Sequence, residues 1–183
     1  MKKYEFTGET KEIRLLFRTA TLHRIRATVA FGIVEVGDLG GWIEKEENLS
    51  HEGKAWVCGD AKVWGNAKVC GDAKVCGDAE VCGDAKVCGD AEVCGDAKVF
   101  SASHVLVIGA IGSRNDFTTF YRDKDNEITV KCGCFLGKID RFLEKVTQTH
   151  GDSKYTLVYR AAVEVAKLQI DLSGEAPKDA DEE

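Results

Sequence analysis

The sequence predicts a mainly β protein whose middle third is a parallel β-helix, preceded by a β cap and followed by an α+β module. The first observation is a valine at every sixth residue: Val57, Val63, Val69, Val75, Val81, Val87, Val93 and Val99. The second is an alanine two residues before each of these valines. The third is a Gly-Asp or Gly-Asn pair that begins two residues after seven of them. A period this regular indicates a repeat architecture.

Each six-residue unit combines a short extended segment with a tight corner. Residues two apart in an extended segment share a face, so Ala and Val point inward while the Lys or Glu between them points outward. Gly followed by Asp or Asn is typical of tight corners, because these residues tolerate positive φ. One unit cannot bury its Ala-Val face alone, so the units must stack on one another as a solenoid.

Residues 55–105 resemble the repeats of hexapeptide-repeat proteins. The resemblance implies a left-handed parallel β-helix in which three units make one triangular turn, an exception to the usual right-handed crossover. Residues 18 apart would then lie one above another at ~4.8 Å. The outward charges fit this spacing, because Lys62, Glu80 and Lys98 alternate in sign along one column, and Lys74 lies beside Glu92. A Cys, Trp or Phe directly after the valine departs from the family pattern.

Six of the eight cysteines fall into outward columns of the predicted helix. The columns are Cys58, Cys76 and Cys94; Cys70 and Cys88; and Cys82 between Trp64 and Phe100. Parallel columns do not converge as zinc ligands must, so no metal site is expected. The column spacing permits disulfides. The chain shows no signal-peptide pattern and no transmembrane run, which favours a reducing cytoplasm and thiols packed as small apolar side chains. A redox or metal role is the alternative.

The flanking segments differ from the repeats. We expect an N-terminal β cap over residues 1–50, the β-helix over 51–105, the α+β module over 106–171 and a disordered acidic tail over 172–183. In the module, apolar and β-rich runs predict strands at 105–111, 117–122 and 127–131, the last two joined by a turn. Two helices should follow. The first carries Ile139, Phe142, Leu143 and Val146 and ends at Gly151; the second begins at a Ser153 cap and buries Val158, Ala162 and Val165.

One loop and strand of the module carries the side chains expected of an anion site. Hydroxyl, amide and guanidinium donors together suit a phosphate-like ligand. The candidate ligand-binding residues are Ser113, Arg114, Asn115, Asp116, Thr118, Thr119, Arg122 and Lys131. No phosphate-binding or dinucleotide-binding fingerprint accompanies them. The alternative is that Arg114, Asn115 and Asp116 are turn residues that bond their own backbone.

One outward column would be an exposed apolar patch in a monomer. It contains Trp64, Cys82 and Phe100. Hexapeptide-repeat proteins are commonly trimers, so the resemblance implies a homo-oligomer, a trimer above all, with this column at or near the interface.

Charge excludes nucleic acid as a partner. Residues 171–183 hold six acidic residues and one lysine, a net charge of −5, which leaves −1 of the total of −6 for the rest of the chain. A nearly neutral body lacks the basic stripe of a nucleic-acid binder. No membrane partner is expected either.

The repeats contain no evident catalytic set, so the sequence favours a non-catalytic binding protein without a cofactor. Residues 37–50, GDLGGWIEKEENLS, followed by HEGKAWV, resemble the leader of hexapeptide-repeat proteins from phages and prophages. This resemblance implies a structural or interfering protein. We expect its C-terminal module to capture a small nucleotide-like anion or a host protein, for example to counter host defence.

Two enzymatic alternatives remain, besides a purely structural phage protein. Many hexapeptide-repeat proteins are acyltransferases with a His general base between subunits, and His51 and His104 border the predicted helix here. The long loop that usually carries that His is absent. A γ-type carbonic anhydrase needs three zinc-binding His on the coils, and the repeats contain none.

Overall fold

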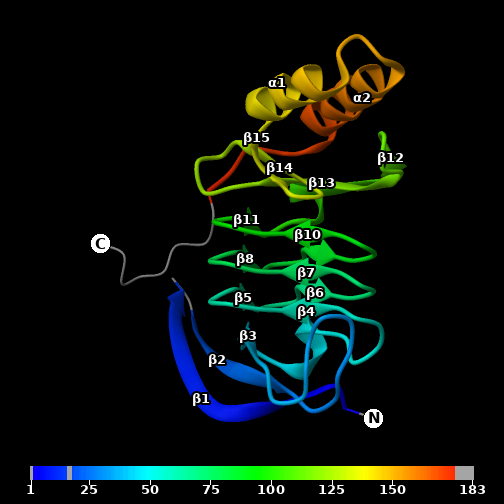
Figure 1. Ribbon diagram of the computed structural model, residues 1–183. Coiled ribbons are helices and arrows are strands. Elements are labelled where there is room, and N and C mark those ends of the chain that lie inside the picture. Colours follow the sequence, from blue (N-terminus) through cyan, green and yellow to red (C-terminus); the bar gives the residue numbers. More distant parts are fainter. Residues whose placement is uncertain (1, 16–17, 176–183) are drawn as a thin grey trace.

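The structure, a computed structural model, describes residues 2–15 and 18–175 (Figure 1). The strands are β1 (Tyr4–Leu15), β2 (Arg18–Ala27), β3 (Leu39–Ile43), β4 (Trp56–Val57), β5 (Lys62–Val63), β6 (Lys68–Val69), β7 (Lys74–Val75), β8 (Glu80–Val81), β9 (Lys86–Val87), β10 (Glu92–Val93), β11 (Lys98–Val99), β12 (Val105–Ile111), β13 (Asp116–Arg122), β14 (Ile128–Cys132) and β15 (Phe135–Lys138). The α-helices are α1 (Ile139–His150) and α2 (Lys154–Gln169). Two short 3-10 helices are η1 (Glu46–Asn48) and η2 (Ala102–His104).

The repeats form a β-solenoid of parallel two-residue strands, which confirms the predicted architecture. The strands stack in three columns, β5-β8-β11, β4-β7-β10 and β6-β9, and each strand pairs with the one 18 residues further along. The alanines and valines of the repeats lie inside with at most 1% of their surface exposed. The corner glycines from Gly59 to Gly95 have φ between +61° and +75°, a conformation that favours glycine.

The outward charges form the ladder expected from an 18-residue offset. Lys62 Nζ lies 3.1 Å from Glu80 Oε1, and Lys98 pairs with the other oxygen of Glu80. Lys74 Nζ lies 3.3 Å from Glu92 Oε1 in the neighbouring column. These pairs are partly exposed, so each contributes a few tenths of a kcal/mol.

The N-terminal strands belong to the solenoid's own sheet. The antiparallel strands β1, β2 and β3 continue into β5-β8-β11, and β3 pairs in parallel with β5 at Trp42 and Lys62. This offset is 20 residues, and the isolated bridge between Leu49 and Val69 repeats it. The buried Asn48 amide donates to the carbonyls of Gly65 and Ala67 at 3.2 and 2.8 Å, so η1 packs on the first turn of the solenoid. Parallel stacking therefore begins before residue 51.

The C-terminal part is an antiparallel sheet, in the order β12-β13-β14-β15, that follows the last turn of the solenoid and carries α1 and α2 on its far side (Figure 1). The predicted strands are present, with β15 as an additional edge strand. The core between sheet and helices contains Phe120, Val130, Phe142 and Val163. Helix α1 ends at Gly151, whose φ is +57°, as predicted.

The predicted buried face of α2 was wrong in part. Ala162 is buried as expected, but Val158 and Val165 are 39% and 49% exposed. The inward side chains are instead Tyr159 and Val163, together with Thr156, Ala162 and Ala166. The helix is rotated because the ring of Tyr159 packs edge-on against Phe142 at 5.4 Å. Ser153 precedes the helix but makes no side-chain capping bond.

Asp123 is a buried charge where the solenoid meets the C-terminal sheet. The backbone of Asp123 forms an isolated antiparallel β-bridge with Ala97, and the next residue, Lys124, donates its N–H to the carbonyl of Asp96. The Asp123 carboxylate is 1% exposed and accepts from Thr129 at 2.6 Å and from Lys138. Burial acts to raise the pKa of this carboxyl, but Lys138, Thr129 and two backbone N–H groups outweigh burial and hold the pKa below its usual value.

We expect Asp123 to make folding more sensitive to acid. Its folded-state pKa is depressed, so its contribution to stability is complete above the unfolded-state pKa of about 3.9 and is lost as the pH falls through the lower folded-state value. Urea unfolding at pH 7 and pH 3 should therefore show a larger loss of stability for the wild type than for Asp123→Asn. Equal losses in the two proteins would contradict this assignment.

Within the described residues, no helix combines the length and the apolar character needed to cross a membrane.

Candidate functional site

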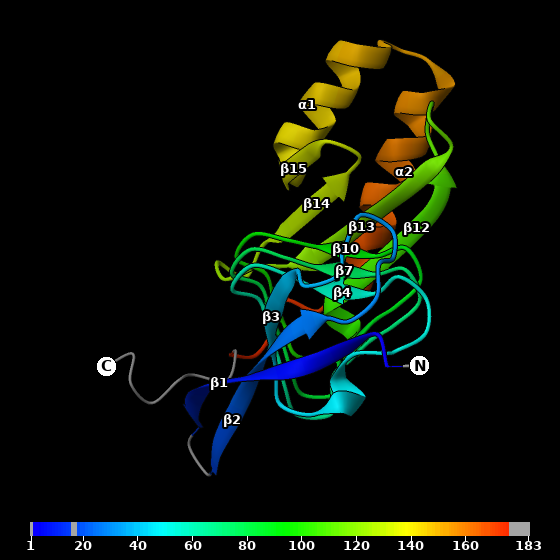
Figure 2. The same ribbon diagram turned by 60° about the horizontal axis from the view of Figure 1, so that its bottom comes forward.

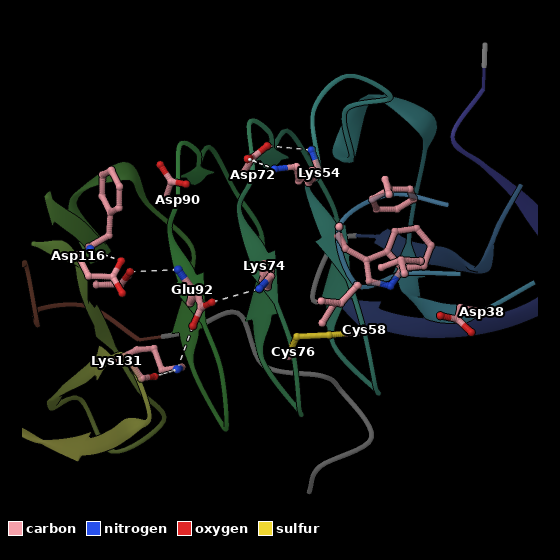
Figure 3. A pocket seen from close by; sticks show the side chains of 18 of the residues that line it. Asp38, Lys54, Cys58, Asp72, Lys74, Cys76, Asp90, Glu92, Asp116 and Lys131 are labelled. Atoms are coloured by element: carbon pink, nitrogen blue, oxygen red, sulfur yellow. Dashed lines mark hydrogen bonds and ion pairs between the residues drawn. A yellow bond between two sulfur atoms is a disulfide. The ribbon is translucent and has the colours of Figure 1, made fainter. Parts of the chain in front are cut away.

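A groove of approximately 640 Å³ runs along the β4-β7-β10 face of the solenoid (Figure 3). One end is formed by the loop from Phe31 to Leu39, and the other by β13, β14 and the turn after β14. We call this space the groove. Its lining residues are Phe31, Gly32, Ile33, Val34, Asp38, Leu39, Lys54, Trp56, Cys58, Asp72, Lys74, Cys76, Asp90, Glu92, Asp116, Phe117, Thr119, Lys131 and Gly133.

The floor of the groove is a row of ion pairs. Lys74 Nζ and Lys131 Nζ lie 3.3 and 2.9 Å from the two oxygens of Glu92. Burial acts to raise the pKa of Glu92, but Lys131 and Lys74 outweigh it and lower the pKa. Closer to the N-terminal end, Lys54 Nζ lies 3.4 Å from Asp72. All three lysines of the groove therefore already have carboxylate partners.

The lining carries more negative than positive charge. Three lysines face five carboxylates, those of Asp38, Asp72, Asp90, Glu92 and Asp116, which is a formal surplus of two negative charges. Asp38 accepts the N–H of Glu35 at 2.8 Å, and Asp116 accepts that of Phe117 at 2.7 Å. No ion pair or hydrogen bond occupies the Asp90 carboxylate within residues 2–15 and 18–175, so it is free to meet a cation.

Apolar side chains stand at both ends of this polar floor. Phe31 and Trp56 pack edge to face with their ring centroids 5.4 Å apart. Beside them, Ile33 and Leu39 are 83% and 53% exposed, and Phe117 at the opposite end is 39% exposed. Large apolar side chains left in water around a groove are typical of a binding surface.

The structure brings three of the eight predicted ligand residues into the groove. Asp116, Thr119 and Lys131 line it, and the Thr119 hydroxyl accepts the N–H of Glu92 at 3.0 Å. Ser113, Arg114 and Asn115 lie on the exposed turn between β12 and β13 and are not among the lining residues. Asn115 has φ of +52°, and Asp116 bonds the adjacent backbone N–H. This local bonding is the turn geometry considered as the alternative.

Thr118 and Arg122 lie away from the groove. Alternate residues of β13 face opposite sides, and the Thr118 hydroxyl lies 3.2 Å from Cys132 Sγ inside the module. Arg122 is fully buried, and its guanidinium donates to Asn126 and to the carbonyls of Ser173 and Gly174. The Arg122 side chain therefore has structural partners in place of a ligand.

The column expected at an oligomer interface is covered within the chain. Trp64 and Cys82 are each 3% exposed and pack with Ile13, Leu22 and Trp42 from β1, β2 and β3. Figure 2 shows β1 and β2 extending to one side of the coils. Phe100 is half-buried beside the same cluster and lies under the Arg122 guanidinium. The expectation of an exposed patch was wrong, because the hairpin of β1 and β2 covers it; homo-oligomer formation stays a prediction.

Four of the repeat cysteines are oxidised, which differs from the expectation of free thiols. Cys58 is bonded to Cys76, and Cys70 to Cys88. The stacked positions hold the Cα atoms of each pair 4.7 Å apart, within the range that a disulfide requires. The first of these disulfides lies in the groove floor (Figure 3).

The two histidines considered for acyl transfer do not line the groove. His51 Nδ1 accepts the N–H of Lys3 at 3.1 Å, before the first repeat. His104 is 2% exposed, accepts the N–H of Phe100 at 3.4 Å and lies beyond the last repeat, where burial lowers its pKa. They therefore mark opposite ends of the solenoid and share no site. In the described part of the chain, no three His, Cys, Asp or Glu side chains are grouped to hold a metal ion.

Sequence reasoning missed most of the groove. The 18-residue offset correctly paired Lys74 with Glu92 but did not show that this column forms a floor. The loop carrying Phe31, Ile33 and Leu39 has no repeat to place it, and its position depends on contacts with Trp56. The sequence signal was limited to apolar residues next to glycines, at Phe31-Gly32-Ile33 and Leu39-Gly40.

A comparison with models of known protein families found no match to the chain, and a comparison with curated proteins found no matching relative.

Proposed function

We propose that this chain is a non-catalytic binding protein that holds an extended segment of a partner protein in the groove. The observation that carries the proposal is the pairing of exposed apolar side chains at both groove ends with a lining that holds two more carboxylates than lysines, in which the Asp90 carboxylate has no partner among the described residues. A peptide with apolar residues flanking a Lys or Arg matches this pattern, since its cation would meet Asp90 and its apolar side chains would cover Ile33, Leu39 and Phe117.

A small anionic ligand is the weaker candidate. It would need the ammonium groups of Lys54, Lys74 and Lys131, each of which already faces a carboxylate. Separating these pairs leaves Asp72 and Glu92 beside the anion, where like charges repel. The groove therefore favours the partner-protein form of the function over the nucleotide form.

The biological setting of the proposal comes from the sequence. The resemblance of residues 37–57 to phage hexapeptide-repeat proteins supports a phage or prophage origin, and with it a host protein as the partner. Interference with a host defence system is the use we propose for such capture.

Peptide selection tests the proposal directly. Random 12-residue peptides displayed on phage are selected on the immobilised full-length protein, and the winners are synthesised and titrated by fluorescence anisotropy. We expect apolar peptides with a Lys or Arg, whose affinity falls about tenfold or more in Ile33→Asp/Leu39→Asp, because each change puts a charge into an apolar contact. Both positions are exposed, so the variant should fold.

Leu168→Asp is the matched control, because Leu168 is 89% exposed on α2, outside the groove. Its affinity for the selected peptides should equal that of the wild type. Peptides that bind the groove variant as tightly as the wild type would refute the proposal. Calorimetric heat with ATP that disappears in Lys131→Ala would establish the anion form instead.

A further inference from the structure

Three cysteines form one column along the groove, and only two of them are bonded to each other. Cys58 and Cys76 form the disulfide, and both line the groove (Figure 3). Cys94, the third member, is a half-buried free thiol on the next turn of the solenoid. The disulfide therefore has a thiol one turn away from it.

Cys94 is stacked on Cys76 in the same way as Cys76 is stacked on Cys58. Strand β4 pairs with β7 at Val57 and Val75, and β7 pairs with β10 at Val75 and Val93, in the same register. The N–H of Cys58 donates to the carbonyl of Val75 at 2.8 Å, and that of Cys76 donates to the carbonyl of Val93 at 2.9 Å. A column geometry that admits the first disulfide admits the second equally well.

We propose that Cys58, Cys76 and Cys94 are a thiol–disulfide exchange site in which the disulfide moves by one turn of the solenoid. The Cys94 thiolate attacks Sγ of Cys76, the bond from Cys76 to Cys58 breaks, and Cys58 leaves as a thiolate that takes up the proton released by Cys94. One disulfide and one thiol exist before and after, so the step needs no external oxidant or reductant.

The exchange places a free thiol among the residues that line the groove. Before it, the free thiol is Cys94, whose backbone N–H and carbonyl are both bonded to the Tyr121 hydroxyl at 3.3 and 2.9 Å. After it, the free thiol is Cys58, which lines the groove. Burial raises the pKa of Cys94, against the opposing effect of Lys131. The attacking thiolate is therefore a minor species at neutral pH, and exchange should become faster as the pH rises.

The second disulfide provides an internal control. Cys70 and Cys88 occupy equivalent stacked positions, but the residue 18 places beyond Cys88 is Leu106, and the residue stacked before Cys70, at the 20-residue offset of the Leu49–Val69 bridge, is Ser50. This column has no third thiol, so its disulfide has nowhere to move.

Thiol trapping tests the proposal on the oxidised full-length protein without any ligand, so its outcome is independent of the proposed function. The protein is incubated at pH 8, trapped with N-ethylmaleimide in denaturant and digested with trypsin. Residues 55–62 then contain Cys58 alone, and residues 69–74 contain Cys70 alone. We expect labelled Cys58 in about one molecule in ten or more, because exchange between equivalent positions leaves both isomers populated.

Two variants make the result specific. Cys94→Ser and Cys94→Ala should each lower Cys58 labelling about tenfold or more, since the attacking thiol is gone. Residues 75–86 and 87–98 have identical sequences, so the exposed Lys86→Arg change is added to give the two peptides different masses and to identify the bond from Cys76 to Cys94 directly.

Three outcomes would overturn the proposal. These are no labelling of Cys58 in the wild type, equal labelling of Cys58 in the Cys94 variants, and labelling of Cys70 to the same extent as Cys58. The last two results would mean incomplete oxidation in place of exchange.

Discussion

Gly83→Ala should destabilise the protein by about 3 kcal/mol or more, whereas Gly89→Ala should cost only about 1 to 2 kcal/mol. Both glycines follow a Val-Cys pair and have positive φ, +61° and +70°, so both variants incur the strain of a left-handed alanine. They differ in what stacks above them. A Cβ at Gly83 would lie 2.3 Å from the carbonyl oxygen of Phe100, while a Cβ at Gly89 would meet nothing within 4 Å.

The difference between the two variants isolates the stacking of one turn on the next. Thermal unfolding followed by circular dichroism should place the midpoint of Gly83→Ala roughly 2 to 8 °C below that of Gly89→Ala, given about 2 to 4 °C per kcal/mol for a chain of this size. Equal midpoints would mean that the backbone at Gly83 has no close neighbour above it, which contradicts the three-column solenoid.

The solenoid could be predicted because its contacts repeat. One six-residue period determines which face is buried, and one offset of 18 residues correctly aligns Lys62, Glu80 and Lys98 from the sequence alone. In parallel stacking, residues a fixed number of positions apart in the sequence are neighbours in space. The repeat pattern therefore also predicts the contacts between turns.

The parts that escaped prediction depend on contacts without a repeat. The column of Trp64 and Cys82 was assigned to solvent because nothing in the repeats shows that Ile13 and Leu22, more than forty residues earlier, fold back over it. The face of α2 was misplaced because its residues are apolar on more than one side, so periodicity alone could not choose between them. Packing against Phe142 made that choice.

The oxidation state of the cysteines could not be predicted from the sequence either. The sequence correctly placed Cys58 beside Cys76 but left their oxidation state to a guess about compartment. A disulfide across two turns stabilises chiefly by restricting the unfolded chain, and the 18-residue separation makes this worth about 3 kcal/mol. If the proposed exchange occurs, that stabilisation is retained, because Cys76 and Cys94 are also separated by 18 residues.

The candidate site escaped prediction in a further way. Arg122 and Arg114 looked alike in the sequence, as two guanidinium groups of one anion site, but only Arg114 reaches solvent. The partners of Arg122 include carbonyls at Ser173 and Gly174, more than fifty residues away in a segment expected to be disordered. No local sequence pattern predicts a contact between residues so far apart in the chain.

Arg122→Ala is therefore expected to lower the free energy of unfolding by about 3 to 5 kcal/mol, because it removes a fully buried side chain, opens a cavity and deletes the donors that hold the segment after α2. Its Nε donates to Asn126 at 3.0 Å, its Nη atoms donate to Ser173 at 3.1 Å and to Gly174 at 2.6 Å, and its guanidinium lies 4.6 Å from the ring centroid of Phe100. Removing the side chain frees the segment after α2 as well as the end of β13.

Arg114→Ala is the matched comparison, since the same change at an exposed turn should stay within about 0.5 kcal/mol. Urea unfolding of both variants at pH 7 decides between the two views of Arg122. A structural role predicts a large loss for Arg122→Ala alone, together with faster hydrogen exchange over residues 171–175 because their anchor is gone. If both variants were as stable as the wild type, the buried guanidinium would not hold the C-terminal segment, and Arg122 would return to the set of possible ligand-binding residues.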